Sequence, residues 1–181
     1  MSQFAQACLL TYALAAAAGP GPTPRVGPVE TVREVYRLEK AMLEGAGPSP
    51  LAEPERSRLF SRRFASLWAE DERFARATGD IGNVVGDHDV LIQAQDHDET
   101  TLGDLRLSLS SRSPARAVVT ATFHVFRHEP PRVIRLVLVV EGGRWVIDDI
   151  LHEGRSVAEA LARPRPCVEG VELPCEGGKE P

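Results

Sequence analysis

The sequence predicts an α+β domain in which N-terminal helices pack on one face of a curved antiparallel sheet. Three observations lead to this prediction. Up to about residue 79, apolar residues recur at intervals of three and four, as in amphipathic helices. From about residue 90 the interval changes to two, as in half-buried strands. The long strand segments are separated by short turns, which suits antiparallel neighbours because parallel strands need crossovers of about a dozen residues or more.

Two helices are expected before the sheet. The first ends at the Gly- and Pro-rich run 45–48 and carries an apolar stripe at helical spacing. Pro54 begins the second helix and Gly79 ends it. The stripe of the first helix is Val29, Val32, Val35, Tyr36 and Leu43, and that of the second is Leu59, Phe60, Phe64, Leu67, Trp68 and Phe74.

The sheet is expected to consist of one leucine-rich strand and three longer strands. Leucines at 102, 105, 107 and 109 predict the first strand, with a slip near Gly103. Alternation predicts the longer strands over 115–127, 132–140 and 144–151, and a short helix is expected over 157–162. The sequence Glu141-Gly142-Gly143 is typical of a tight hairpin turn between the last two strands.

Alternation also assigns the faces of the last strand. Period two puts Trp145, Ile147 and Asp149 on one side of the sheet. We expect this side to meet the helices because it carries a large aromatic residue and an isoleucine. The opposite side then takes Val146, Asp148 and Ile150.

Composition limits the class of protein. The chain has 181 residues and a mass of 19.7 kDa, which suits a single domain. Hydrophobic residues make up 43% and charged residues 26%, as in an average soluble globular protein. The net charge of −5 and the pI of about 5.6 argue against a nucleic-acid-binding protein, because that class carries a concentrated basic face.

The N-terminus, residues 1–18, is predicted to be a signal peptide. Residues 5–18 form an apolar run that ends in small residues, and the Pro- and Gly-rich linker 19–28 follows. The run is too short to span a membrane, which takes about 20 apolar residues. We therefore expect a periplasmic or secreted protein. The alternative is an Ala-rich helix packed on the domain, since the first four residues carry no Lys or Arg.

The folded body is expected over 29–162, followed by an irregular tail over 163–181 that is again rich in Pro and Gly. The tail contains Cys167 and Cys175, eight residues apart. In an oxidising compartment such a pair is expected to form a disulfide. The alternative is two free thiols in a reducing cytosol.

Three motifs in order carry a resemblance to a known family. They are Val32-Arg33-Glu34-Val35-Tyr36, Ala94-Gln95-Asp96 and Trp145-Val146-Ile147-Asp148-Asp149-Ile150. With these motifs the body resembles a bacterial envelope family known as domain of unknown function number 3828. It also resembles the nuclear-transport-factor-two-like or cystatin-like α+β cone. The resemblance implies a fold and an envelope location but no chemistry. It places Asp96 near the mouth of the cone, as a buried carboxylate bonded to backbone or as a pocket residue.

The segment 80–104 is unusually acidic. It contains seven acids, no Lys or Arg, and the sequence Asp-His-Asp twice. Paired carboxylates could present oxygens to a hard cation, which takes six to eight of them. The alternative, which we prefer, is a solvated loop whose aspartates cap turns. No metal site is predicted.

Five side chains are candidates for ligand binding. Tyr36 and Trp68 lie on the helix stripes, where the alternative is an ordinary core position. Gln95 and Asp96 belong to the segment that the resemblance places at the mouth of the cone. Asp148 is expected to face the helices or the pocket, and its alternative is an arginine ion pair or a cap. No catalytic residue and no cofactor is predicted.

These candidates suit a non-catalytic exported module that binds a small ligand or an envelope protein, because apolar walls with a few polar groups are typical of ligand pockets. The alternative is an enzyme of the ketosteroid-isomerase or dehydratase kind. It would use a pocket aspartate as base, with Tyr36 and a protonated carboxyl as hydrogen-bond donors. A homodimer through the sheet is a further expectation.

Overall fold

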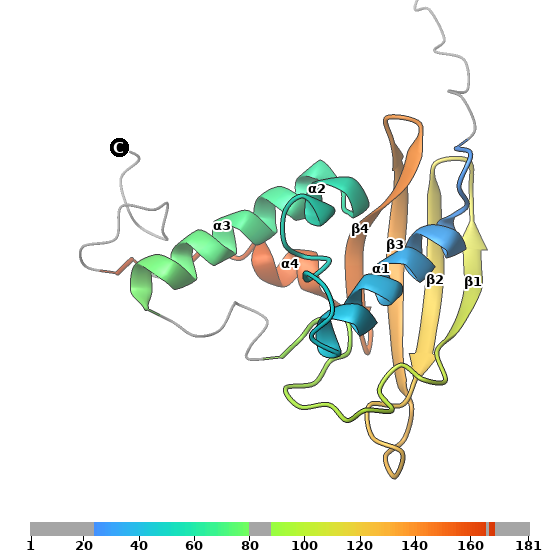
Figure 1. Cartoon of the computed structure of the whole chain (residues 1–181). Helices are drawn as coiled ribbons and strands as arrows, with labels where there is room; N and C mark the ends of the chain where they lie inside the picture. The colour runs from blue at the N-terminus through green and yellow to red at the C-terminus, as the bar shows by residue number, and fades with distance from the viewer. Residues whose placement is uncertain (1–23, 80–87, 166, 169–181) are drawn as a thin grey trace, which may run out of the picture.

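The computed structural model describes residues 24–79, 88–165 and 167–168 (Figure 1). Within them, helices pack against one face of a five-stranded antiparallel sheet of order β1-β2-β3-β4-β5. The predicted α+β architecture is confirmed. The helices are α1 (Pro28–Leu43), α2 (Glu55–Leu59), α3 (Arg62–Thr78) and α4 (Val157–Leu161). The strands are β1 (Arg106–Arg112), β2 (Arg116–Phe123), β3 (Arg132–Glu141), β4 (Arg144–His152) and β5 (Arg155–Ser156).

Helix α1 packs across the sheet and contacts β1, β2 and β4. It begins at Pro28, where a missing backbone N–H does no harm because the first turn has no acceptor for it. Val32 and Val35 are fully buried on the predicted stripe. The Tyr36 ring also lies in this layer and meets the Phe123 ring of β2 at 5.7 Å between centroids.

The single helix predicted from Pro54 to Gly79 is wrong, because the chain breaks between α2 and α3. Phe60 is extended and forms a parallel bridge with Ile147 at the edge of β4. The Ser61 N–H donates to the Ile147 carbonyl at 2.7 Å, so it is not available to continue α2. The Ser61 Oγ accepts from the Phe64 N–H at 3.0 Å, which caps α3 and restarts the helix.

The first strand begins later than the leucine spacing predicts. The chain turns just before β1, and the Gly103 N–H donates to the Thr100 carbonyl at 2.8 Å. Leu102 has a φ of 63° and is buried outside the sheet. Pairing starts only where Arg106 lies opposite Thr122. Leu102 therefore adds to the core from a loop rather than from a strand.

A β-bulge in β4 changes which side chains face the helices. Ile147 and Asp149 pair with consecutive residues of β3, so Asp148 between them is the extra residue. The bulge shifts the alternation by one, and Ile150 rather than Asp149 joins the core below the helices. The prediction for the second half of this strand is therefore wrong. The helix-facing residues of β4 in the core are Trp145, Ile147 and Ile150.

The turn predicted before β4 is confirmed. Glu141 pairs with Arg144, and Gly142 and Gly143 between them both have positive φ, 57° and 76°. Glycine adopts such angles without strain, as two-residue hairpins require. At the other side of the sheet, β1 is an edge strand that pairs with β2 (Figure 1). No helix among the described residues is long and apolar enough to cross a membrane.

Candidate functional site

An open cavity of about 220 Å³ lies beside α3, where two loops meet it. We call it the Trp68 cavity. The loops come from the connection between α1 and α2 and from the acidic segment before β1. The cavity therefore joins three parts of the chain that are far apart in sequence. Its lining residues are Ser49, Leu51, Ala52, Trp68, Glu72, His88, Asp89 and Val90.

The indole of Trp68 is fixed from two sides. Its ring stacks near Phe64, with centroids 6.1 Å apart and planes at 14°. Its Nε1–H donates to Glu72 Oε1 at 3.2 Å, one turn further along α3. The other Glu72 oxygen accepts from Arg56 Nη1 at 2.9 Å, and the Arg56 Nε donates to Glu53 at 3.1 Å. The Arg56 side chain is only 8% exposed, so this wall is held by a largely buried network of hydrogen bonds.

Asp89 forms the opposite side of the cavity and is held by its own loop. Its Oδ1 accepts from the Leu91 N–H at 2.7 Å and the Ile92 N–H at 3.3 Å. This is an Asx turn, which the sequence analysis preferred for this acidic segment. The Tyr36 Oη–H donates to the Leu91 carbonyl at 3.1 Å, so α1 is tied to the same loop.

Glu39 lies behind Asp89 and is fully buried. Within the described residues, neither of its carboxyl oxygens has a hydrogen-bond partner of good geometry. Burial and the neighbouring Asp89 carboxylate raise the pKa of Glu39 to about 10. Burial and the same two acids raise the pKa of Tyr36 as well. Glu39 is therefore a neutral carboxylic acid at pH 7.

Glu39 was not predicted as a site residue, although the sequence contains a sign of it. The residue falls at helical spacing within the apolar stripe of α1, three positions after Tyr36 and four before Leu43. A charged residue on a buried stripe indicates either a partner or a raised pKa. Of the predicted candidates, Tyr36 and Trp68 are brought to this region, around Asp89.

Gln95 and Asp96 do not line the Trp68 cavity. The Asp89 N–H donates to the Ala94 carbonyl at 3.0 Å, and the Gln93 N–H donates to the Asp89 carbonyl at 2.7 Å. These bonds close a loop over 89–94 and turn the following residues outward, so both candidates are exposed. The expectation of a buried Asp96 carboxylate is wrong. Asp96 remains a candidate only for a ligand bound at the surface.

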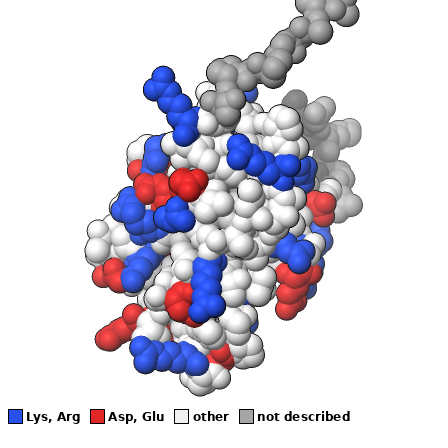
Figure 2. Space-filling model, turned by 90° about the vertical axis from the view of Figure 1, so that its right-hand side faces the viewer, with Lys and Arg blue, Asp and Glu red and all other residues white. Residues whose placement is uncertain are grey.

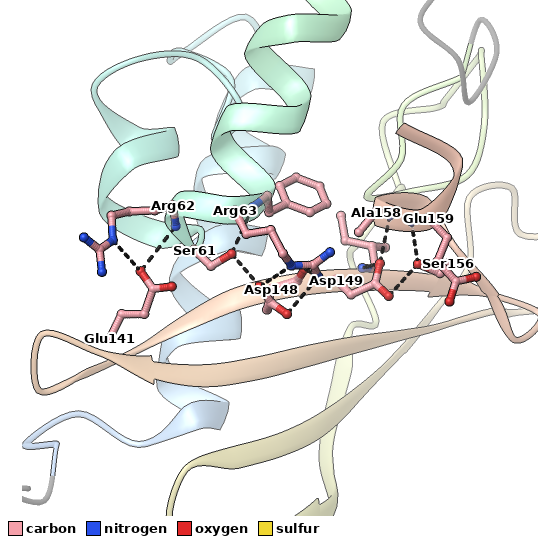
Figure 3. A network of polar contacts seen from close by, with 11 residues as sticks. Ser61, Arg62, Arg63, Glu141, Asp148, Asp149, Ser156, Ala158 and Glu159 are labelled. Carbon is pink, nitrogen blue, oxygen red and sulfur yellow. Dashed lines mark hydrogen bonds and ion pairs between the residues drawn. The ribbon is translucent and has the colours of Figure 1, made fainter. Parts of the chain in front are cut away.

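Asp148 lies at the junction of β4 and α3, away from the Trp68 cavity (Figure 3). Its Oδ1 accepts from Ser61 Oγ at 2.6 Å and from Arg63 Nε at 3.1 Å, and its Oδ2 accepts from Arg63 Nη2 at 2.8 Å. Partial burial acts to raise the pKa of Asp148, but the bonds from Arg63 and Ser61 outweigh it and lower the pKa. The carboxylate thus anchors the break between α2 and α3 to the bulge.

Asp149 uses its carboxylate for the next helix (Figure 3). Its Oδ1 accepts from the Ala158 N–H at 3.0 Å and its Oδ2 from Ser156 Oγ at 2.7 Å. The Ser156 Oγ in turn accepts from the Glu159 N–H at 2.9 Å. Both aspartates of β4 therefore hold elements together, which agrees with the alternative considered from sequence.

Other acids of the 80–104 segment also stabilise turns. Asp98 Oδ1 accepts from the Thr100 N–H and hydroxyl at 2.7 and 2.6 Å. Asp104 accepts from the His124 N–H at 3.0 Å. In the described part of the chain no group of His, Cys, Asp or Glu could hold a metal ion. Asp80 and Asp87, the predicted signal peptide and Cys175 lie outside the described residues, so the disulfide with Cys167 stays a prediction.

No family model matches this chain, so the resemblance to the envelope family stays a prediction. The chain is a distant homologue of the uncharacterised protein YqhG of Escherichia coli strain K12. The two are 29% identical over 133 residues, which is 73% of this chain and 41% of YqhG. The chain thus spans less than half the length of this relative.

Two solved structures are similar in outline. One is a protein of unknown function from Bacteroides thetaiotaomicron, with 20% identity and a TM-score of 0.46 over 68% of this chain and 88% of that one. The other belongs to the type VI effector–immunity complex Tae3–Tai3 of Ralstonia pickettii, with 16% identity and a TM-score of 0.45 over 67% of this chain and 93% of that one.

Proposed function

We propose that this protein is an exported, non-catalytic module of the cell envelope that binds a small ligand in the Trp68 cavity. The observation that carries the proposal is the fixed wall of this cavity, in which the Trp68 indole is held by Glu72 opposite the Asp89 turn. Side chains that are already ordered lose little entropy when a ligand binds, so even a small contact area supports useful affinity.

The lining favours a small organic cation. Asp89 contributes a carboxylate, Glu72 is already paired with Arg56 behind the wall, and no Lys or Arg is among the lining residues. An aromatic ring next to carboxylates stabilises an ammonium group by charge and by cation–π attraction. The volume of about 220 Å³ is below the range of about 300–1,000 Å³ for drug-sized ligands. The site therefore suits a head group or a side chain rather than a large cofactor.

Fluorescence of Trp68 tests this proposal. The chain has two tryptophans, so Trp145→Phe leaves Trp68 as the only reporter. We expect phenethylammonium to change its emission saturably, while the neutral analogue 2-phenylethanol binds at least about tenfold more weakly, a difference of about 1.4 kcal/mol.

Two variants in the same background serve as controls. Asp89→Asn keeps an acceptor for the Leu91 N–H but removes the charge, and it should weaken binding of the ammonium. His97→Ala lies in a separate surface cavity and should leave binding unchanged. Equal binding of the two probes, or no response to either, would contradict the proposed ligand class and the proposed site.

Export is tested separately. If residues 1–18 are a signal peptide, the intact mass of protein recovered from an envelope fraction should correspond to a chain that begins near Gly19. Recovery of a chain that retains Met1 to Ala18 would contradict cleavage.

The neutral Glu39 acid favours a second candidate, an acid–base enzyme at the same place. Asp89 would remove a proton from the carbon next to a carbonyl and return it at the γ-carbon. Glu39 is buried behind Asp89 and does not line the cavity, so it would act through Asp89 and not on the substrate. The Tyr36 hydroxyl already donates to the Leu91 carbonyl, so it would not be the donor to the enolate oxygen.

Conversion of a β,γ-unsaturated ketone to its conjugated isomer tests this second candidate by ultraviolet absorbance. An enzyme should raise the rate over buffer and lose that increase with Asp89→Asn. Binding of phenethylammonium without any isomerisation would contradict the enzyme and support only the binding module.

A further inference from the structure

The face of the sheet that points away from the helices has its own chemistry. We call it the open sheet face and define it by Arg106, Arg116, Val118, Thr122, Val133 and Arg135. Arg106 lies opposite Thr122 and Thr122 opposite Val133 in the register of β1, β2 and β3. Directly opposed residues share a face, and so do every second residue of one strand. All six side chains therefore project from the same side.

No described helix covers this side of the sheet (Figure 1). In β2 the odd-numbered residues from Ala117 to Phe123 are buried in the core below the helices, while Val118, Thr120 and Thr122 remain partly exposed. In β3, Val133 is 49% exposed and Arg135 is exposed. Antiparallel sheets with one solvated face usually carry polar residues there. This face carries such polar residues, among them Ser108, Thr120 and the arginines, together with Val118 and Val133.

The six residues that define the open sheet face include three arginines and no acid. Strands β1 and β2 contain no Asp or Glu, and the one acid of β3 is Glu141 at its end, which accepts from the Arg62 N–H at 3.2 Å. On β4, Asp149 lies opposite Val137 and is bonded to the Ala158 N–H of α4, and Asp148 interacts electrostatically with Arg116. Arg106, Arg116 and Arg135 make no ion pair within the described residues. The whole chain carries −5, so this face is strongly asymmetric against the rest of the molecule.

Helix α1, by contrast, has its arginines neutralised. Arg37 donates to Glu34 at 2.7 Å, and Arg33 pairs with Glu30 at 3.4 Å. Seen from the β1 edge, white surface fills the middle of the molecule, and blue and red side chains lie around it (Figure 2). By register, the open sheet face combines Val118 and Val133 with arginines that make no ion pair among the described residues, and arginine is enriched at protein interfaces.

We propose that the open sheet face is a docking surface for a different protein that presents an acidic patch. Opposite charges at the rim would steer the encounter, and the valines and threonines would be buried on contact. This partner is separate from the ligand of the Trp68 cavity, so either proposal can fail without the other.

Charge argues against two other occupants. A second copy of this chain packed face to face would bring arginines of the two copies together without an acid between them, and like charges at an interface are unfavourable by several kcal/mol. A nucleic acid needs a denser basic footprint than three arginines interrupted by Val118, Thr122 and Val133.

Photo-crosslinking in intact cells tests the proposal on the full chain. Benzoylphenylalanine is placed at Val133 in the open sheet face and, as a control, at exposed Ser57 in α2. We expect a discrete product with another protein from Val133 and none of the same mass from Ser57. Mass spectrometry should locate the crosslink in a segment rich in Asp and Glu.

Charge reversal then decides whether the arginines carry the contact. Arg106→Glu, Arg116→Glu and Arg135→Glu together should lower the yield at Val133 at least about tenfold. The matched triple Arg73→Glu, Arg76→Glu and Arg163→Glu reverses exposed charges on α3 and after α4, and it should leave the yield unchanged. A product made of two copies of this chain, a product with lipid or nucleic acid, no product at all, or insensitivity to the reversal would each overturn the proposal.

Discussion

Two pairs of acids in this molecule are treated in opposite ways. On β4, Asp148 and Asp149 are supplied with donors, a guanidinium and hydroxyl for one and a helix N–H and hydroxyl for the other. Beside the Trp68 cavity, Glu39 meets Asp89, a second acid, and is fully buried without a cation. The pKa of Asp148 is lowered and that of Glu39 is raised to about 10.

The opposite pKa shifts of Asp148 and Glu39 distinguish acids that stabilise the fold from acids that are available for function. A carboxylate surrounded by donors stabilises the fold in its charged form, and its chemistry is used up in doing so. A buried acid beside another acid destabilises the fold when it is charged. Such a residue is therefore a candidate for a functional role and not for a stabilising one. The contributions of Asp148 and Glu39 to stability must therefore respond to pH with opposite signs, and this can be measured.

The largest expected effect comes from removing the support of β4. Trp145 is 3% exposed in the core, so Trp145→Ala should lower the free energy of unfolding by about 3–5 kcal/mol, as large-to-small core changes do. Asp148 and Asp149 lie on β4 itself, and Glu39 lies on α1, which contacts β4. The substitution therefore weakens the packing that supports both pairs of acids. Urea denaturation at pH 7 measures the change. An unchanged midpoint would contradict the sheet assignment and with it the comparison.

The next effect concerns the pH dependence due to Glu39. Its pKa is raised from 4.5 to about 10, so the folded state keeps a proton that the unfolded state has lost. Stability should therefore fall as pH rises within this window, by at most about 1.4 kcal/mol per pH unit. Between pH 7.5 and 9.5 we expect the wild type to lose about 2–3 kcal/mol.

Glu39→Gln supplies the contrast for this measurement. A neutral amide of similar size should remove most of the slope and leave the variant more stable than the wild type at pH 9. Glu30→Gln, on the exposed face of the same helix, should keep the wild-type slope. Parallel curves for the wild type and Glu39→Gln would show that Glu39 ionises normally.

How far the sequence predicted the structure depended on whether the pattern was local. The hairpin before β4 was predictable because Gly142 and Gly143 set the turn by themselves. The helix break at Ser61 and the bulge at Asp148 were not predictable, because each is stabilised by contact with the other. Ser61 donates to Ile147 and to Asp148, which are 86 and 87 positions away in the sequence. Apolar periodicity is read within one element at a time. The predicted helix and the predicted strand alternation were therefore both extended past the point where the two segments contact each other.

The candidate site shows the same limit. Tyr36 and Trp68 were found because aromatic residues on a helix stripe are visible in sequence. Asp89 was noticed only as part of an acidic run, because its neighbour Glu39 is 50 residues earlier in the chain. Asp96 was wrongly expected to be buried. The resemblance gave only the position of the segment, whereas the loop closed by the Asp89–Ala94 hydrogen bond turns Asp96 towards solvent.

The smallest effect is expected from Asp148→Asn, which sharpens the comparison from the other side. Its lowered pKa means that its contribution is present above the unfolded pKa near 3.8 and is lost as pH falls through the lower folded value. Arg63 is 52% exposed, so solvent screens the ion pair and we expect a loss of only about 0.5–1 kcal/mol at pH 7. The difference between variant and wild type should shrink as pH falls below 3.8 and vanish once Asp148 is protonated in the folded state. Glu153→Gln, in an ion pair with both side chains more than 75% exposed, should change nothing measurable at any of these pH values. If Asp148→Asn instead raised stability at pH 7, as Glu39→Gln should at pH 9, the two pairs would be the same kind of acid and the distinction between them would fail.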